Sequence, residues 1–398
     1  MEELCRALPK AELHAHLHGS ASIHTIAKLL DGKPDGEERA TRLRAIADSI
    51  GSISLDECFE VFTAIHAAVR SSSDVECITR DVLQDFQKDN VCYLELRTTP
   101  RILDDTDEAG YVDCVVRAIR AHRRAFTAHV LHHQHDEDKH TQHPMIVRLL
   151  LSIDRGSATL SEAMETVKLA LSLQAKTRKM EDGVTPNHSD QGSGGHQQTS
   201  YDHGNDDDDE DEKGVVVGID FSGNPHKGEF SLLRPALEEA RRRGLKVTVH
   251  VAEAPRHEET LEILDFEPDR LGHALCLDNQ CEARLRALRT PVEICPTSNM
   301  RTLKLASLSE HPTLQWLLRA NHPVSINTDD AGVFGTTPSQ ELALVARTYD
   351  LSREEVARLA RAPLHHAFFE CPREMAKLVE RFERETVHAL STSSSSTL

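Results

Sequence analysis

The sequence predicts an α/β fold, a closed (β/α)8 TIM barrel, on three observations. First, eight short apolar runs rich in β-branched residues recur along the 398 residues, and most of them are separated by segments with helical spacing of apolar side chains. Second, strands that alternate with helices pair in parallel through right-handed crossovers, and eight such units close most economically into a barrel. Third, the first strand is not followed by the Gly-rich turn that an open nucleotide-binding sheet would favour.

The strands are expected at eight positions, and the helices lie between them. A segment at 232–243, for example, has apolar residues at roughly helical spacing and is followed by Gly244, a typical helix stop. Residues 1–390 are predicted to form a single barrel domain, followed by a low-complexity tail at 391–398. The predicted strands are 12–17, 92–97, 146–153, 215–221, 246–251, 270–272, 292–295 and 324–327.

Composition limits the classes of partner. The formal net charge is −19, and no basic stripe is present, which disfavours nucleic-acid binding. A chain with 39% hydrophobic residues can bury a large core, yet it has no apolar run long enough to span a bilayer and no apolar leader, so no membrane partner is expected. Nine scattered cysteines are typical of a reducing compartment. A monomeric cytoplasmic enzyme is the simplest interpretation.

Two insertions interrupt the barrel pattern. The segment 180–213 is almost free of apolar residues and ends in an acidic run at 206–212, so it is predicted to be a disordered loop insertion rather than an interdomain linker. A His-rich insertion at 132–143 precedes the third strand. It could chelate metal, but a solvated loop is favoured because no ordered scaffold fixes its histidines.

Three histidines near the N-terminus carry the most chemical information. His14, His16 and His18 alternate with apolar residues, so in a strand all three would project from one face. Adjacent neutral imidazoles suit a divalent metal such as zinc. Taken alone, the pattern also fits packed or surface histidines.

Further polar groups follow three later predicted strands at their carboxyl ends. His250 lies at the end of one strand and is followed three residues later by Glu253. His273 follows the next strand, and the pair Asp329 and Asp330 follows the last. Each group has an ordinary alternative, such as a core histidine, a helix-start carboxylate or a turn former. Their shared position at one end of the barrel, where the active sites of such barrels lie, favours a common site.

These motifs together resemble the adenosine and AMP deaminase branch of the zinc-dependent amidohydrolases, and within it the adenosine-deaminase-like proteins that act on N6-methyl-AMP. The resemblance extends from residue 9 to residue 334 and therefore covers essentially the whole predicted barrel. The shared segments are Pro-Lys-x-Glu-Leu-His-x-His-Leu from residue 9, Ser-Gly-Asn-Pro at 222–225, His-Val-Ala-Glu at 250–253, Leu-Gly-His-Ala at 271–274, Cys-Pro-Thr-Ser-Asn at 295–299 and Thr-Asp-Asp-Ala-Gly-Val-Phe at 328–334.

The resemblance and the chemistry of the residues agree on a catalytic centre. One zinc per chain would be held by His14, His16, His250 and Asp329, leaving a position for water, whose pKa the metal lowers. Glu253 would donate a proton to ring nitrogen 1 of a purine. His273 would orient the hydroxide and help to deprotonate the water. Asp330 would accept a hydrogen bond from the purine edge or from the water, and the N–H of Gly223 would meet ring nitrogen 3.

Substrate choice depends on fewer residues. Thr98, Thr99, Pro100 and Arg101 resemble the phosphate-side segment of the N6-methyl-AMP deaminases, although a loop with helix-capping threonines is the alternative. His66 and Asp154 align with positions of that subfamily that contact the nucleotide, and His16 is expected to face both metal and substrate. His18 departs from the pattern, because Asn is expected there in the N6-methyl-AMP enzymes and Asp in adenosine deaminases. A histidine can face a phosphate, so this departure argues mildly against plain adenosine.

The predicted function is zinc-dependent hydrolysis of an N6-substituted purine nucleotide, N6-methyl-AMP, to IMP and methylamine. Adenosine deamination to inosine and ammonia is the alternative. A catalytically silent binding module is disfavoured, because the candidate metal ligands and the candidate acid are all present.

Overall fold

A computed structural model describes residues 1–31, 33, 35–48, 55–132, 144–178, 214–369 and 371–392. The predicted insertion at 132–143, except for His132, lies outside these residues, as do the predicted insertion at 180–213 and tail residues 393–398. The expectations of disorder for these segments therefore stay predictions.

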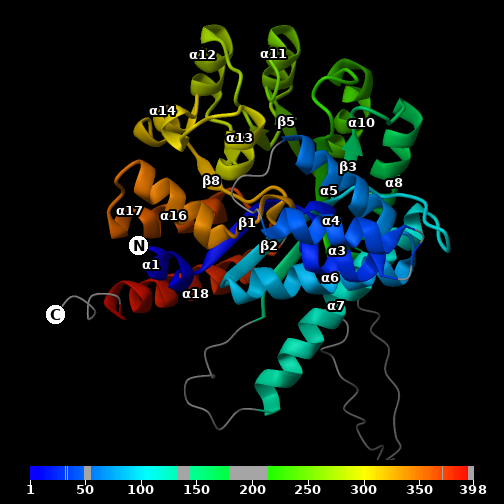
Figure 1. Ribbon diagram of the computed structural model, residues 1–398. Helices are drawn as coiled ribbons and strands as arrows, with labels where there is room; N and C mark the ends of the chain where they lie inside the picture. Colours follow the sequence, from blue (N-terminus) through cyan, green and yellow to red (C-terminus); the bar gives the residue numbers. More distant parts are fainter. Residues whose placement is uncertain are drawn as a thin grey trace, which may run out of the picture.

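Eight parallel strands pair in sequential order around a barrel, as the sequence predicted (Figure 1). The circle closes between the first strand and the segment after the last, where His16 N donates to Asp329 O at 2.9 Å and Asp329 N to His14 O at 2.8 Å. Every strand lies within two residues of its predicted position. The strands are β1 (Lys10–His16), β2 (Val91–Thr98), β3 (Ile146–Asp154), β4 (Val216–Ser222), β5 (Lys246–Val251), β6 (Arg270–His273), β7 (Val292–Ile294) and β8 (Val324–Ile326).

The first strand ends earlier than expected, and this corrects one prediction. Residues Leu17–Ser20 form a short helix, α2, directly after His16. His18 therefore leaves the two-residue alternation of the strand and does not project beside His14 and His16. The alternating histidines extend the strand pattern beyond His16, so the sequence did not reveal the turn. Gly19 and Ser20, the residues typical of a turn, lie only at the end of this segment.

Helices follow the strands around the outside of the barrel. The link from β1 to β2 is the most elaborate, with the helices α3–α5 grouped beside α6 (Figure 1). The predicted helix at 232–243 is observed as α10, which ends before Gly244 at φ 92°. The helices up to β5 are α1 (Glu2–Ala7), α2, α3 (Ile23–Leu30), α4 (Gly36–Asp48), α5 (Leu55–Ala68), α6 (Ser72–Lys88), α7 (Glu108–His132), α8 (Leu160–Arg178) and α10 (Phe230–Arg242).

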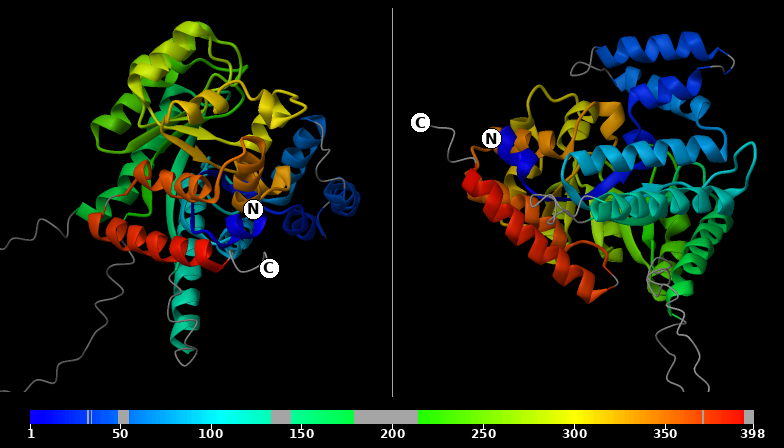
Figure 2. Two further views of the ribbon diagram at one scale, coloured as in Figure 1. Left: turned by 90° about the vertical axis from the view of Figure 1, so that its left-hand side faces the viewer. Right: turned by 90° about the horizontal axis from the view of Figure 1, so that it is seen from below.

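In the second half of the barrel, one helix links β5 to β6 and one links β6 to β7, whereas several helices follow β7 and β8. Its helices are α11 (His257–Phe266), α12 (Asn279–Leu288), α13 (Pro296–Thr302), η2 (Leu308–Glu310), α14 (Leu314–Arg319), α15 (Ala331–Phe334), α16 (Pro338–Thr348), α17 (Arg353–Arg361), η3 (Ala362–His365) and α18 (Pro372–Thr392). Helix α18 lies beside α1, and the far end of α7 projects away from the barrel (Figure 2).

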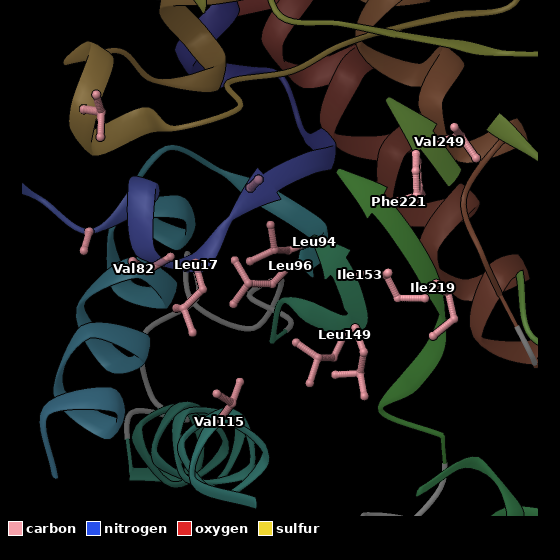
Figure 3. Packing of buried hydrophobic residues seen from close by; sticks show 14 of the residues in the cluster. Leu17, Val82, Leu94, Leu96, Val115, Leu149, Ile153, Ile219, Phe221 and Val249 are labelled. Carbon is pink, nitrogen blue, oxygen red and sulfur yellow. The ribbon is translucent and has the colours of Figure 1, made fainter. Parts of the chain in front are cut away.

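The apolar core lies between the strands and the surrounding helices. Leu94 and Leu96 of β2 point outwards to the layer that includes Val82 of α6 and Val115 of α7 (Figure 3). Burying such side chains stabilises the fold by roughly 1.5–3 kcal/mol each. This outer shell of the barrel is the main hydrophobic core.

The barrel interior, in contrast, is ionic. Glu95 and Arg97 alternate with the outward-facing leucines of β2, and their side chains point inwards. Arg97 donates to Asp220 of β4 and to Glu293 of β7, both at 2.9 Å, and none of these side chains is exposed. TIM barrels usually fill this space with branched apolar side chains. Here the paired charges form the floor beneath the polar groups at the carboxyl ends of the strands.

Candidate active site

Four polar side chains from three strands and the segment after the last strand meet at the carboxyl end of the barrel. One ligand atom from each of His14, His250, His273 and Asp329 lies within 4.8 Å of those of the others. The structure thus brings together residues up to 315 positions apart, as the common strand ends predicted.

His16 also reaches this centre. Its Nε2 lies 3.3 Å from His250 Nε2 and 3.4 Å from Asp329 Oδ1. His273 lies at the same centre, with Nε2 4.0 Å from Asp329 Oδ2 and its ring centroid 4.8 Å from that of His14. The predicted ligands His14, His16, His250 and Asp329 therefore share one centre with His273, and distance alone does not separate His273 from the predicted ligands.

The donor atoms of His14 fit a metal. Its Nδ1 lies 2.6 Å from Glu293 Oε2. Burial alone would raise the pKa of Glu293, but Arg97 and Arg270 hold it well below its usual value, so this carboxylate is ionised and accepts a hydrogen bond from His14 Nδ1–H. The lone pair is then on Nε2, a buried atom without a hydrogen-bond partner. Nε2 faces Asp329 Oδ1 at 3.4 Å. When the ring is neutral, a buried imidazole lone pair and a carboxylate oxygen face each other here, and this donor set suits a divalent cation.

Two other candidate ligands also contact polar side chains on the side that faces away from the centre. His250 Nδ1 lies 3.2 Å from Asp220 Oδ1, close but not aligned as a hydrogen bond. Asp220 stays ionised, because Arg97 and then His250 outweigh burial and hold its pKa well below the usual value. Ser298 donates to Asp329 Oδ2 at 2.6 Å, which leaves Oδ1 to the centre.

Backbone strain concentrates at the same strand ends. Ala252, His273 and Asp329 have φ values of 53°, 65° and 64°, in the left-handed region that residues with a side chain seldom adopt. Each costs of order 1–3 kcal/mol and persists where the surrounding structure enforces it, commonly at functional sites. These turns direct the side chains after β5, β6 and β8 inwards.

Glu253 and Asp330 supply two acids with altered proton affinity. Burial raises the pKa of Glu253, whose Oε2 lies 3.7 Å from His273 Nε2. Burial, and then the Asp329 and Glu253 carboxylates, raise the pKa of Asp330 well above its usual value. Asp330 packs directly against Gly19, where a Cβ would lie 1.7 Å from Asp330 Oδ1.

His18, His66 and Arg101 form a second group beside the centre. The rings of His18 and His66 are stacked, with centroids 6.4 Å apart and an interplanar angle of 20°. Arg101 Nη1 donates to His66 Nδ1 at 2.8 Å, so the remaining proton of a neutral His66 lies on Nε2. His18 Nε2 is a buried atom without a hydrogen-bond partner. Although His18 lies outside the strand, it is grouped with two other predicted substrate contacts, His66 and Arg101.

The neighbouring predicted substrate contacts differ in the exposure of their side chains. The buried hydroxyl of Thr98 is hydrogen-bonded to that of Tyr111, whereas Thr99 is exposed and Pro100 is half-buried. Arg101 also donates to Val69 O at 2.6 Å through Nη2. Only part of this segment is therefore available to a ligand through its side chains.

Asp154 and Gly223 lie against each other on the opposite loops. Gly223 has φ 109°, and a Cβ there would lie 2.1 Å from Asp154 Oδ1. Asp154 also accepts from Gly156 N at 2.9 Å and from Ser157 Oγ at 2.6 Å. The glycine is thus required both by its backbone angle and by close approach.

Sequence reasoning missed the residues that support the centre from below and from the side. The signal for some of them was available, because an isolated charge in an otherwise apolar strand indicates an inward-facing partner. The missed residues are Glu293, Asp220, Arg270, Glu12, Ser298 and Tyr111.

The described part of the chain contains no helix that combines the length and the apolar character needed to cross a membrane. A fold of eight parallel strands with a polar, metal-compatible centre at their carboxyl ends is typical of a metallo-dependent barrel hydrolase.

Comparison with known proteins identifies the family. The sequence profile described as "Adenosine deaminase" matches residues 9–177 and 210–390. The N6-mAMP deaminase of Arabidopsis thaliana is 37% identical over 379 residues, covering 92% of this chain and 94% of the relative. The N6-methyl-AMP deaminase of Homo sapiens is 33% identical over 370 residues, covering 91% and 89%. The crystal structure of arabidopsis ADAL complexed with IMP superimposes with a TM-score of 0.75 at 34% identity, covering 97% of this chain and 99% of that one.

The chain belongs to the adenosine deaminase family. It is a hydrolytic deaminase that acts on C–N bonds of purines.

Proposed function

We propose that this protein hydrolyses N6-methyl-AMP to IMP and methylamine, using one zinc ion per chain. The observation that carries the proposal is the pairing of two neighbouring sites, a centre of histidines and Asp329 and a group of His18, His66 and Arg101 beside it. The two together match a purine base and a 5′-phosphate. The similarity to relatives named for this reaction supports the same substrate.

His14, His16, His250 and Asp329 would hold the zinc, because their donor atoms converge and His14 Nε2 has no other partner. Zinc, when bound, supplies a Lewis acid that lowers the pKa of water and makes it nucleophilic. All other steps belong to side chains of the protein.

Glu253 would act as the general acid. Its raised pKa favours the protonated carboxyl group, and this proton would pass to ring nitrogen 1 as water attacks carbon 6. His273 would orient the attacking water, and Asp330 would bind the purine edge. The raised pKa of Asp330 favours a protonated, donating carboxyl group over the accepting role expected from the sequence.

The phosphate would bind at His18, His66 and Arg101. Arg101 holds His66 with Nδ1 as acceptor and therefore with Nε2–H as donor, and a guanidinium and an imidazole N–H both suit a phosphate monoester. Thr99 and backbone groups of the same loop complete the cradle. Asp154 and Gly223 would border the purine from the other side.

A monomer in the cytosol that binds neither nucleic acid nor membrane is part of the proposal. The eight cysteines with described side chains are all free, which supports a reducing compartment. The net charge of −19 supports the absence of a nucleic-acid partner.

The substrate proposal is tested by comparing the kcat/KM of the purified protein for N6-methyl-AMP, AMP and adenosine. We expect N6-methyl-AMP to be preferred at least tenfold, with methylamine and IMP as products. A preference for adenosine would support the alternative, plain adenosine deaminase, and no turnover of any of the three would refute the proposal.

The metal assignment is tested by elemental analysis. We expect one zinc per chain in the wild-type protein, and loss of both zinc and activity in the His14→Ala/His16→Ala double variant, since half of the ligand set is removed. Stoichiometric zinc in the folded double variant would show that the ligands lie elsewhere.

A further inference from the structure

The Nδ1 atom of His273 has a defined partner. It lies 3.0 Å from Nδ2 of Asn299, which belongs to α13. Both side chains are buried, at 2% and 0% exposure. The tautomer of His273 therefore depends on which end of the Asn299 amide faces it.

The backbone decides the orientation of that amide. Cys295 N donates to the other end of the amide, Asn299 Oδ1, at 3.2 Å. A backbone N–H can only donate, so the atom that it meets is the oxygen. The NH2 group then faces His273, where it donates to Nδ1.

His311 gives independent support from the next loop. Its Nδ1 accepts from two backbone N–H groups at the start of α14, Thr313 N at 3.3 Å and Leu314 N at 3.0 Å. Burial lowers the pKa of His311 to about 4, so the ring is neutral and its single proton lies on Nε2. Nε2 lies 3.2 Å from Asn299 Oδ1 and donates to it.

We propose that Asn299 and His311 are positioning residues that fix His273 in the tautomer with its proton on Nε2. The Nδ1 lone pair is occupied by the Asn299 amide, so the ring presents an N–H donor to the centre. His273 Nε2 faces two carboxyl oxygens, Glu253 Oε2 at 3.7 Å and Asp329 Oδ2 at 4.0 Å. In this tautomer His273 can orient an attacking water but has no lone pair on Nε2 for a metal.

His14 shows the opposite arrangement in the same centre. Its Nδ1 donates to the carboxylate of Glu293, so Nε2 keeps its lone pair. An acceptor behind one histidine and a donor behind the other thus assign them different tasks, metal ligand and hydrogen-bond donor. This inference rests on the proposed function and deepens it, because it excludes His273 from a ligand set that distance alone would allow.

The tautomer can be measured directly by NMR on protein with 15N-labelled histidine. The His273 signal is assigned by its loss in the His273→Asn variant. In wild-type protein, with zinc and after chelation, we expect a protonated Nε2 and an unprotonated Nδ1. A proton on Nδ1 of His273 would overturn the inference whatever the enzyme's substrate, whereas a protonated Nε2 in a protein without deaminase activity would count against the proposed function alone.

Two variants test whether Asn299 and His311 fix the tautomer of His273. Asn299→Asp is almost isosteric but replaces the donor with an acceptor, so we expect the His273 proton to move to Nδ1 and kcat to fall ~10²-fold, with KM and zinc content nearly unchanged. His311→Gln keeps one acceptor and one N–H donor, so the wild-type tautomer and most of kcat should remain. Wild-type tautomer and kcat in Asn299→Asp would overturn the inference. If that variant does not fold, the wild-type spectrum decides.

Discussion

Among single residues, Glu253 owes its proposed chemistry to its surroundings. It follows β5 after the left-handed Ala252, and burial raises its pKa. An ordinary surface glutamate would be ionised near neutral pH and could not serve as an acid. The turn after β5 therefore places the carboxyl group and also alters its proton affinity.

Replacing this acid should separate binding from chemistry. Glu253→Gln keeps the size of the side chain but has no proton to give, so we expect kcat to fall ~10²–10⁴-fold while zinc content and ligand binding remain. In wild-type protein, kcat/KM should decline as the pH rises through the raised pKa of Glu253, because the acid is then lost. Rates within a few-fold of wild type, or an unchanged alkaline decline in the variant, would exclude this role.

In the proposed function, Arg101 is the residue that would distinguish nucleotide from nucleoside. It holds His66 and would contact phosphate, so Arg101→Ala should raise the KM for N6-methyl-AMP more than tenfold, equivalent to a charge-assisted contact of ~1.5–3 kcal/mol. The slower reaction with the matching nucleoside should hardly change, since that substrate lacks the phosphate. Arg70→Ala, which removes an exposed cation paired with Asp104, is the control for general charge attraction. Equal losses for nucleotide and nucleoside in Arg101→Ala would place the phosphate elsewhere.

At the level of elements, the loops after β3 and β4 depend on one close contact. Gly223 follows β4 with φ 109°, and Asp154 at the end of β3 occupies the space that its side chain would need. The chain can bring these two loops together only with glycine at this position.

Gly223→Ala should therefore perturb the site through its backbone. We expect a loss of ~1–3 kcal/mol in the free energy of unfolding and a higher KM, because the left-handed angle and the contact with Asp154 cannot both be kept. Gly156→Ala is a matched control in the same loops, since its Cβ would meet its nearest neighbours, Asp154 Oδ1 and Lys227, at an ordinary 3.4 Å. Urea unfolding and steady-state kinetics measure both effects, and equal behaviour of the two variants would contradict this argument.

Strands, turns and contacts between loops were predictable from the sequence to different degrees. The strands were found because apolar runs such as Val247 to Val251 have a local signature, and their common carboxyl ends gave most of the centre. The turn at Leu17–Ser20 was not found, because the alternating histidines before it extend the strand pattern. The pairing of His66 with Arg101 was likewise hidden, since it joins α5 to the loop after β2 and has no spacing that a sequence could show.

Across the whole molecule, the barrel combines an apolar shell with an ionic interior. Only the shell was predictable, because hydrophobic alternation reveals which strand face meets the helices but not what fills the barrel. Glu293 illustrates the interior, because its carboxylate accepts hydrogen bonds from Arg97, Arg270 and Thr248. It also accepts one from the Nδ1–H of His14. The same carboxylate thus shares, with Asp220 and Glu95, in balancing two buried guanidinium groups, and it sets the tautomer of a proposed metal ligand.

This dual role predicts that one substitution affects both stability and the metal. Glu293→Gln leaves Arg97 and Arg270 buried with one charge fewer, and breaking a buried ion pair typically costs ~3–5 kcal/mol. A neutral partner also no longer strengthens His14 as a ligand, so zinc affinity should fall ~10–100-fold.

Urea unfolding of the chelated protein isolates the first effect, and competition with a zinc-binding dye measures the second. Asp104→Asn serves as the control, because the Arg70–Asp104 pair is 59% and 60% exposed and such pairs contribute ~0–1 kcal/mol. If Glu293→Gln lost stability without any loss of zinc affinity, the ion network would support only the barrel. If zinc affinity fell alone, the buried charges would be tolerated without this carboxylate. We expect both losses, because the floor of the barrel and the back of the metal centre are formed by the same oxygen atoms.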